Sequence, residues 1–141
     1  MSAMQLSDFI SKILGMPFKA HGRGYDGADC WGVLYLGYRD VLGREMPSYV
    51  DEYVDAGDTE ASRRVIQDKI LSEKHKWDRV EKPQAMDVAF FKLGNTGTHL
   101  GLMIDEKSFI HCEKRIGTVI ERLDSASWKS RVEGVYRLKN V

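Results

Sequence analysis

The first third of the chain carries apolar residues at the spacing of an α-helix. In residues 6–14, leucine, isoleucine and phenylalanine recur every three or four positions, which predicts an amphipathic helix. Ser7 is the expected N-cap, and Gly15 followed by Pro17 is the expected stop signal. Such a helix would turn a single apolar face toward the rest of the protein.

A second helix is predicted after a glycine-rich loop that covers residues 19–29. It would begin at Cys30, run to about Leu42 and close at Gly43. Apolar and aromatic side chains occupy most of its circumference, in contrast to the single stripe of the first helix. We therefore expect this helix to lie in the centre of the fold.

The period of the apolar pattern changes in the last part of the chain. Five short segments rich in β-branched and aromatic residues are predicted as strands: 87–93, 98–104, 107–113, 117–123 and 132–138. The intervening "GNTG" and "DEK" stretches are typical of hairpin turns. Helices followed by consecutive strands predict an α+β fold, in which a central helix near the N-terminus packs on an antiparallel sheet of about five to six strands.

Residues 44–83 are more polar than the segments on either side. Within them, residues 59–72 are predicted as a surface helix with a weak apolar stripe. The chain contains no internal repeat and no low-complexity tract. We interpret residues 1–141 as a single domain in which 44–83 is a polar insertion.

Composition and charge argue against some classes of binding partner, namely nucleic acid and anionic lipid. The 21 basic and 21 acidic residues cancel and the isoelectric point is near 6.9, so no overall positive field would attract nucleic acid or anionic lipid. No apolar run approaches the roughly 20 residues of a membrane span. The N-terminus lacks the basic leader, apolar core and cleavage signature of a signal peptide. We expect a protein that is made in the bacterial cytoplasm, does not bind nucleic acid and has no membrane span.

Cys30 is the first candidate for chemistry. A thiol attacks as its thiolate, and a helix N-terminus stabilises that negative charge. The backbone N–H groups of the same turn could receive the oxyanion that forms when a carbonyl is attacked. The neighbouring carboxylate of Asp29 would oppose ionisation of the thiol. Two compatible roles are open for Asp29, as the N-cap of the helix or as a contact for a cationic group of a substrate.

Two histidines are candidates for the base. His99 and His111 lie on adjacent predicted strands, symmetrically about Asp105. With a connecting loop of three or five residues they would face each other on the same side of the sheet. A Cys–His–His arrangement would form if the helix that begins at Cys30 packs on that side. The alternation points Cys112 away from His111 and indicates a structural thiol, while one bridge between the two cysteines remains compatible with their number.

Three motifs occur in a fixed order along the chain: "DCWGVLYLGY", "MDVAFFKLGNTGTHLGLMID" and "FIHCEKRIGTVIERL". Together they resemble the NlpC/P60 family of cell-wall cysteine peptidases, and the "DCWG" form is similar to the phage-tail and prophage branch of that family. The resemblance spans residues 17–138. It implies a papain-like core and the hydrolysis of peptidoglycan stem peptides, most often between D-γ-glutamyl and a diamino acid.

The resemblance also assigns roles to individual residues. Cys30 matches the nucleophile of the family, His99 the base, and His111 the polar third residue. Asp29 matches a position that helps to bind a substrate amine in some relatives. These roles need no cofactor and no metal.

Other positions depart from the family pattern or are open to two interpretations. Many relatives have a tyrosine near the oxyanion site where this chain has Phe18, which leaves backbone amides, with Tyr25 as a further candidate. Trp31 is interpreted first as a packing residue and second as a platform for substrate. The resemblance implies peptidoglycan peptide and phage tail proteins as partners, and action on the wall as part of a tail.

Three other functions stay open from the sequence. A tail-assembly or wall-binding module with the same fold but without turnover is the main alternative, because Phe18 replaces the tyrosine. A zinc site of Cys30, His99 and His111 ranks lower, since their spacing matches no short zinc motif. An amidase of the CHAP type also has its cysteine before its histidine.

Overall fold

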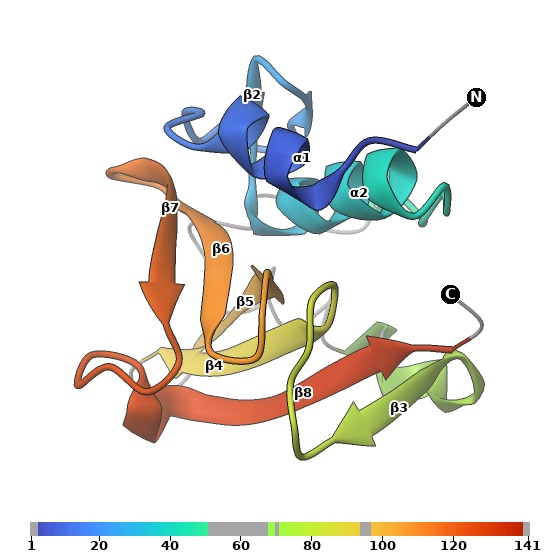
Figure 1. Cartoon of the computed structure of the whole chain (residues 1–141), viewed down its shortest axis with the longest axis vertical. Helices are drawn as coiled ribbons and strands as arrows, with labels where there is room; N and C mark the ends of the chain where they lie inside the picture. Colours follow the sequence, from blue (N-terminus) through green and yellow to red (C-terminus); the bar gives the residue numbers. More distant parts are fainter. Residues whose placement is uncertain (1–2, 51–67, 70, 94–96, 140–141) are drawn as a thin grey trace.

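The computed structural model describes residues 3–50, 68–69, 71–93 and 97–139. In these residues the two α-helices lie on one side of a curved antiparallel sheet (Figure 1). The elements follow in the order α1 (Leu6–Ile13), β1 (Arg23–Gly24), β2 (Gly27–Ala28), α2 (Cys30–Val41), η1 (Lys74–Lys76), β3 (Trp77–Val80), β4 (Val88–Leu93), β5 (Gly97–Met103), β6 (Ser108–Glu113), β7 (Gly117–Arg122), η2 (Lys129–Arg131) and β8 (Val132–Leu138). The predicted α+β class is confirmed.

The main sheet has the strand order β3-β8-β4-β5-β6-β7, and every neighbouring pair is antiparallel. All five predicted strands are present as β4 to β8. β8 returns to pair with β4, so the sheet is not a simple meander. β3 has four residues, lies at one edge of the sheet and was not predicted from the sequence. Its Trp77 packs edge-on against Tyr38 of α2, with ring centroids 6.1 Å apart.

The two predicted helices are confirmed, but the first begins earlier than expected. The N-cap of α1 is Gln5, and Ser7 lies inside the helix, so its assignment as the cap was wrong. The start is fixed instead by a backbone hydrogen bond from Met4 N to the carbonyl oxygen of Asp40 in α2. α2 ends as predicted, because Gly43 adopts a positive φ of 68° just beyond the C-cap.

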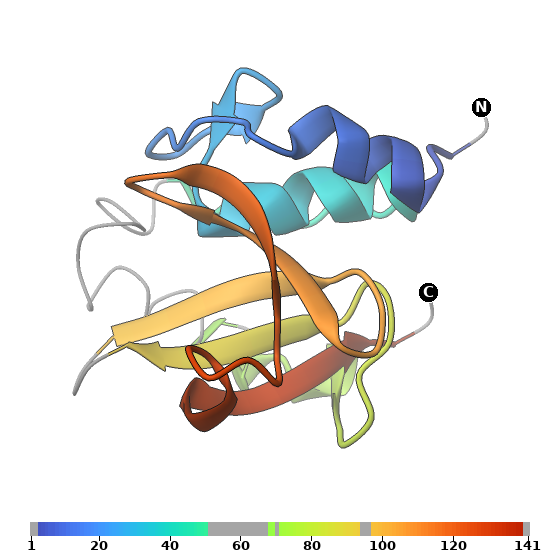
Figure 2. The ribbon, with the colours of Figure 1, turned by 60° about the vertical axis from the view of Figure 1, so that its left-hand side comes forward.

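α2 forms the centre of the main hydrophobic core, between α1 and the sheet. In Figure 2 both helices lie above the sheet and the orange β6–β7 hairpin rises toward them. A Cβ on Gly37 would lie 2.9 Å from Leu102 Cδ2, which shows how closely α2 approaches β5. The helix side of the sheet therefore carries Leu100 and Leu102, as the predicted alternation requires.

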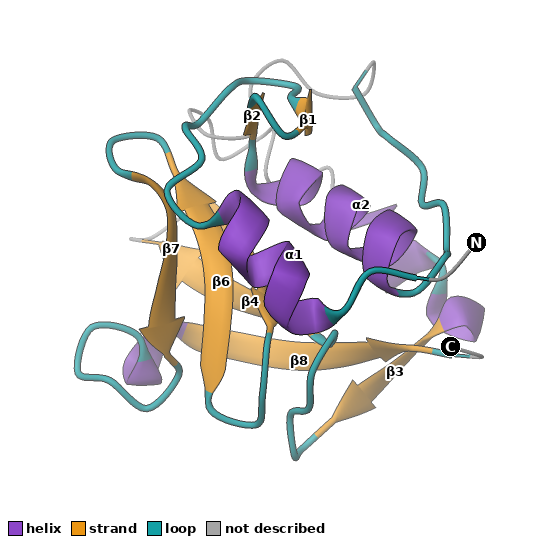
Figure 3. Cartoon of the chain, turned by 45° about the horizontal axis from the view of Figure 1, so that its top comes forward, coloured by secondary structure: helices purple, strands orange, loops and turns teal. Residues whose placement is uncertain are grey.

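A second, smaller core lies on the other face of the sheet. It consists of Ala89, Phe91, Met103, Phe109, Trp128 and Val135. Figure 3 shows α1 and α2 over the first face, with β7 at one edge of the sheet and β3 at the other. The sheet is thus covered by apolar side chains on both faces. Side chains of a central strand therefore alternate between the main core and the smaller core.

The polar insertion is described only in part. Most of the predicted helix at 59–72 and the "GNTG" turn lie outside the described residues. At the start of the insertion, Met46 joins the main core and the carbonyl oxygen of Pro47 accepts from Trp31 Nε1 at 2.8 Å. Within the described ranges, no helix is long and apolar enough to cross a membrane.

Candidate active site

Cys30 is the first residue of α2, directly after a loop. The preceding Asp29 has an extended backbone (φ −94°, ψ −171°), so the helix begins sharply at the cysteine. The Cys30 side chain is 3% exposed. Cys30 and Cys112 are both free thiols, so the bridge between them that the sequence left open is not formed.

Asp29 caps α2 and is held by a buried network. Its Oδ1 accepts from Gly32 N at 2.8 Å and from Arg23 Nη1 at 2.9 Å, and its Oδ2 accepts from His21 N at 3.1 Å. Arg23 also donates to the carbonyl oxygen of Ser48, at 2.6 Å from Nη2. The carboxylate is completely buried. The N-cap role is confirmed, and the contact with a substrate amine stays a prediction.

Gly32 of the "DCWG" motif is required by close backbone packing. A Cβ at this position would lie 2.2 Å from the carbonyl oxygen of Gly22 and 2.8 Å from Ala28 Cβ. Real Cβ atoms do not approach a backbone oxygen so closely, and neither neighbour is the flexible end of a side chain. The glycine therefore lets the loop that carries Asp29 and Arg23 lie directly on the first turn of α2.

Gly32→Ala is expected to lower the free energy of unfolding by about 2–3 kcal/mol, because the loop must move away from the helix. Urea denaturation followed by circular dichroism measures this change. Gly24→Ala is the matched control, since a Cβ there would meet only the exposed Asp26 Oδ1 at 3.0 Å. Equal stabilities of the two variants would contradict the packing argument.

His99 and His111 meet across the β5–β6 pair, as predicted. His99 Nε2 lies 2.6 Å from His111 Nδ1, and the two side chains are 6% and 0% exposed. They were expected to stand directly opposite each other, and this detail was wrong. The strands pair Leu102 with Ile110 and Met103 with Phe109, so continuing this register places His111 beside Gly101. The two rings lie on the same side of the sheet and reach each other diagonally.

The histidine pair lies within aromatic side chains of the smaller core. The Trp128 ring stacks on His99 with centroids 5.9 Å apart, and its plane stands nearly perpendicular to that of His111 at 5.2 Å. Phe91 and Phe109 also contact the pair. These rings hold both imidazoles in place and exclude water from around them.

The body of α2 packs on the opposite face of the sheet from the two histidines, so the expectation that it would cover their face was wrong. The residue that precedes α2, Asp29, lies near β6, because its charge acts on the thiol of Cys112. Burial raises the pKa of Cys112, and the nearby charge of Asp29 raises it further, although a hydrogen bond with Thr118 acts in the opposite direction. Because Asp29 precedes Cys30 and Cys112 follows His111, the helix start and the histidine pair approach the same region of β6.

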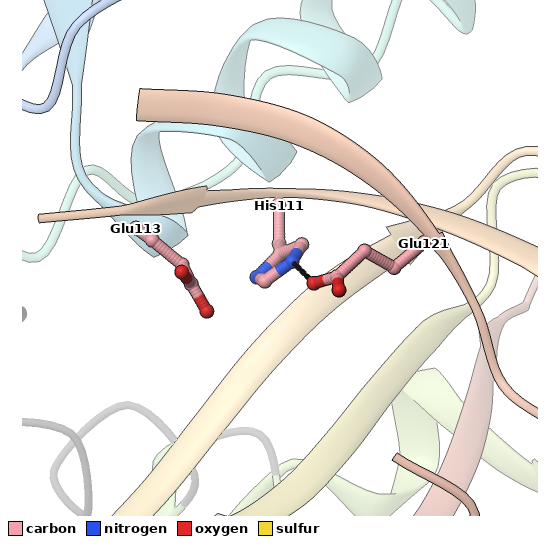
Figure 4. Close-up of side chains that lie close together, drawn as sticks. All are labelled: His111, Glu113 and Glu121. Atoms are coloured by element: carbon pink, nitrogen blue, oxygen red, sulfur yellow. Dashed lines mark hydrogen bonds and ion pairs between the residues drawn. The ribbon is translucent and has the colours of Figure 1, made fainter. Parts of the chain in front are cut away.

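The second ring nitrogen of His111 contacts the carboxylate of Glu121, a residue that was not predicted to belong to the site. His111 Nε2 lies 2.6 Å from Glu121 Oε2 (Figure 4). In the β6–β7 hairpin Val119 pairs with His111, and Glu121 lies two residues further on the same side of the strand. The two-residue spacing between Val119 and Glu121 could have indicated this contact from the sequence. It indicates the contact only when the register that pairs Val119 with His111 is known.

The surroundings of His111 act on its charge in opposing directions. Burial lowers the pKa of His111 below its ordinary value, and the hydrogen bond to Glu121 and the charges of Glu113 and Glu121 offset part of this decrease. The result favours a neutral ring that is hydrogen-bonded at both nitrogens.

The residues that could bind a metal ion differ from the set that the sequence suggested. Among the described residues, the group of potential ligands consists of His111, Glu113 and Glu121, whose ligand atoms lie within 4.8 Å of one another. The suggested trio of Cys30, His99 and His111 is not such a group. Glu121 Oε2 already accepts from the imidazole, so the observed contact is a hydrogen bond between protein groups.

Tyr25 and Trp31 both have partners within the protein. The Tyr25 hydroxyl donates to Asp40 Oδ2, and Asp40 lies ten residues after Cys30, about 15 Å along α2. The Tyr25 hydroxyl is thus engaged with Asp40, and its contribution to the oxyanion site stays a prediction. Trp31 is completely buried and its ring packs on Tyr49 with centroids 5.1 Å apart, which confirms the packing role.

Comparisons with known proteins identify the family to which the chain is similar. The model of the family described as "NlpC/P60 family" matches residues 15–137. The chain is 24% identical over 124 residues to the murein DD-endopeptidase MepS/murein LD-carboxypeptidase of Escherichia coli K12, a match that covers 88% of this chain and 56% of that protein. It therefore spans just over half the length of that relative. A probable endopeptidase of Haemophilus influenzae is 26% identical over 140 residues, covering 98% of this chain and 76% of the relative.

Solved structures share the fold at lower identity. The NlpC/p60 domain of the peptidoglycan hydrolase SagA superposes with a TM-score of 0.61 at 16% identity, covering 97% of this chain and 99% of that domain. At this identity the similarity establishes the architecture and does not by itself assign an activity.

Proposed function

The chain belongs to the NlpC/P60 family, and on this premise we propose that it is a cysteine hydrolase of peptidoglycan stem peptides. The observation that carries the proposal is the buried, hydrogen-bonded pair of His99 and His111 in a chain of this family that starts its central helix with Cys30. A nucleophile, a base and a group that orients the base are the three parts that covalent acyl transfer requires.

In the proposed reaction, Cys30 Sγ gives its proton to His99 and attacks the carbonyl carbon of the scissile amide. His99 then returns the proton to the leaving nitrogen as the C–N bond breaks and a thioester remains on Cys30. A water molecule, deprotonated by His99, hydrolyses the thioester and restores the thiol. His111 orients the imidazole of His99 through the hydrogen bond at 2.6 Å.

The charges around the helix start are compatible with a thiolate. Asp29 would oppose negative charge on the sulfur, but the Arg23 guanidinium forms an ion pair with its carboxylate at 2.9 Å and balances it. The first turn of α2 supplies backbone N–H groups that stabilise negative charge on the sulfur and on the oxyanion. Since Phe18 has no hydroxyl and that of Tyr25 is bound to Asp40, we assign oxyanion stabilisation to backbone amides.

The finer assignments rest on the resemblance of the motifs. We propose that the scissile bond joins D-γ-glutamyl to a diamino acid, and that the protein acts on the wall as part of a phage tail after synthesis in the cytoplasm. The "DCWG" form of the nucleophile motif supports the tail association.

Incubation of the protein with defined muropeptides is expected to yield the fragments of a single cut, identified by mass spectrometry. An uncross-linked tripeptide tests the bond after D-γ-glutamyl. A cross-linked dimer tests for the DD-endopeptidase activity that is named for the E. coli relative. Intact substrates in every reaction, with a protein that is folded, would contradict the proposed hydrolase.

A second candidate is a wall-binding or tail-assembly module without turnover, and Phe18 in place of a tyrosine favours it. Under this alternative, the protein would bind purified wall but leave all muropeptides intact. The same digestion therefore separates the two functions.

A further inference from the structure

Glu121 extends the histidine pair into a relay that crosses three neighbouring strands. His99 on β5 contacts His111 on β6, and His111 contacts Glu121 on β7, each at 2.6 Å. His111 is fully buried, while the Glu121 side chain is 34% exposed. The buried ring thus lies between a second imidazole and a carboxylate that solvent can reach.

The donors and acceptors of this relay fix one arrangement of protons. A carboxylate only accepts, so the bond to Glu121 requires a proton on His111 Nε2. A neutral His111 then carries no proton on Nδ1, which must accept from His99 Nε2. The proton of a neutral His99 therefore sits on Nε2, and its Nδ1 keeps the lone pair that a general base needs.

Without the carboxylate, the hydrogen bond between the two imidazoles could equally run in the opposite direction, with donor and acceptor exchanged. His111 would donate from Nδ1 to His99 Nε2, and the proton of His99 would move to Nδ1. In that state His99 could not take a proton from Cys30 at Nδ1. The two directions differ little for an isolated pair of imidazoles, so an external acceptor has to select one of them.

We propose that Glu121 is the positioning residue of this enzyme, because its hydrogen bond to His111 selects the tautomers of both histidines and leaves His99 ready to act as the base. This inference rests on the proposed function. Glu121 does not touch the reacting atoms and acts only through His111. When His99 becomes protonated during the reaction, the negative charge of Glu121 also stabilises the positive charge on the pair.

Glu113 provides a matched control. Its carboxylate lies near His111 on the other side of the ring from Glu121, and only Glu121 is joined to the imidazole by a hydrogen bond among the residues drawn (Figure 4). Both glutamates add negative charge near His111. A loss specific to Glu121 therefore reports the hydrogen bond and not merely the charge.

Glu121→Ala is expected to lower kcat by about 10²-fold and to change KM by less than about threefold, since the base is misprotonated while the substrate site is intact. Glu121→Gln keeps an acceptor oxygen without the charge, and its kcat should fall by about 10-fold. Glu113→Gln should retain kcat within about threefold of the parent protein. A kcat of Glu121→Ala equal to that of Glu113→Gln would overturn the proposal.

A spectroscopic readout tests the tautomers without relying on activity. Long-range ¹⁵N–¹H correlation spectra of the Cys30→Ala protein should identify His111 as protonated at Nε2 and unprotonated at Nδ1. Adding Glu121→Ala should produce the other tautomer or a mixture, and an unchanged His111 would refute the inference.

Two further outcomes separate the inference from its alternatives. Loss of activity on treatment with EDTA would place Glu121 in a metal site with His111 and Glu113, and would overturn its role as a hydrogen-bond acceptor. If the parent protein cleaves no muropeptide, the proposed function fails, whereas the spectra still decide which way the histidine pair is protonated.

Discussion

Replacing Cys30 with alanine is expected to reduce the release of stem-peptide fragments from purified wall by at least about 10³-fold. The proposed mechanism forms a bond to Sγ, and without the sulfur only weak catalysis from binding and backbone amides remains. The side chain is small, so the free energy of unfolding should change by no more than about 1 kcal/mol. Mass spectrometry of the soluble fragments and thermal unfolding measure the two quantities.

Cys112→Ala is the matched control for this experiment. Cys112 is also a free and buried thiol, but it belongs to the core between helices and sheet and points away from His111. Its replacement should leave cleavage nearly unchanged. Full activity in Cys30→Ala, or equal losses in both variants, would remove the basis for a cysteine nucleophile.

Asp29→Ala is expected to destabilise the protein by about 3–5 kcal/mol, because Arg23 would lose its buried partner while remaining only 12% exposed. The lost N-cap bond to Gly32 N contributes about 1 kcal/mol of this total. Such a loss is a large fraction of the stability of a domain of this size. Urea denaturation gives the change in the free energy of unfolding.

Asp29→Asn separates the cap from the ion pair. Asparagine is as good an N-cap as aspartate but does not carry the charge that pairs with Arg23, so an intermediate loss of stability is expected. If Asp29→Ala were as stable as the parent and only raised KM, Asp29 would contact the substrate amine as first expected, and the structural role would be wrong.

Local sequence patterns were sufficient for most secondary-structure elements. The apolar circumference of residues 30–41 and the terminal Gly43 predict α2 nearly to the residue, because both signals act within a few positions of the chain. β3 was missed because four residues at a sheet edge give no clear alternation. The start of α1 was misplaced because a backbone bond between Met4 and Asp40, 36 positions later, fixes it.

The three proposed catalytic residues could also be predicted from the sequence, since they lie in short motifs that resemble those of the family and occur in the same order. The contacts around these residues could not be predicted in this way. The sequence did not reveal that Arg23 and the backbone amide of His21 both donate to the Asp29 carboxylate. Glu121 carries no motif, and only the pairing of β6 with β7 brings it to His111.

The amino-acid sequence by itself determined the α+β class, the two helices, five strands and the resemblance that singles out Cys30, His99 and His111. Only the tertiary structure decided that α2 covers the face opposite the histidines, that the two imidazoles meet diagonally and that Glu121 completes their relay. The reason is that periodicity depends on neighbouring residues, whereas side-chain contacts across a sheet depend on strand register. A shift of one residue in register turns every side chain of a strand to the other face.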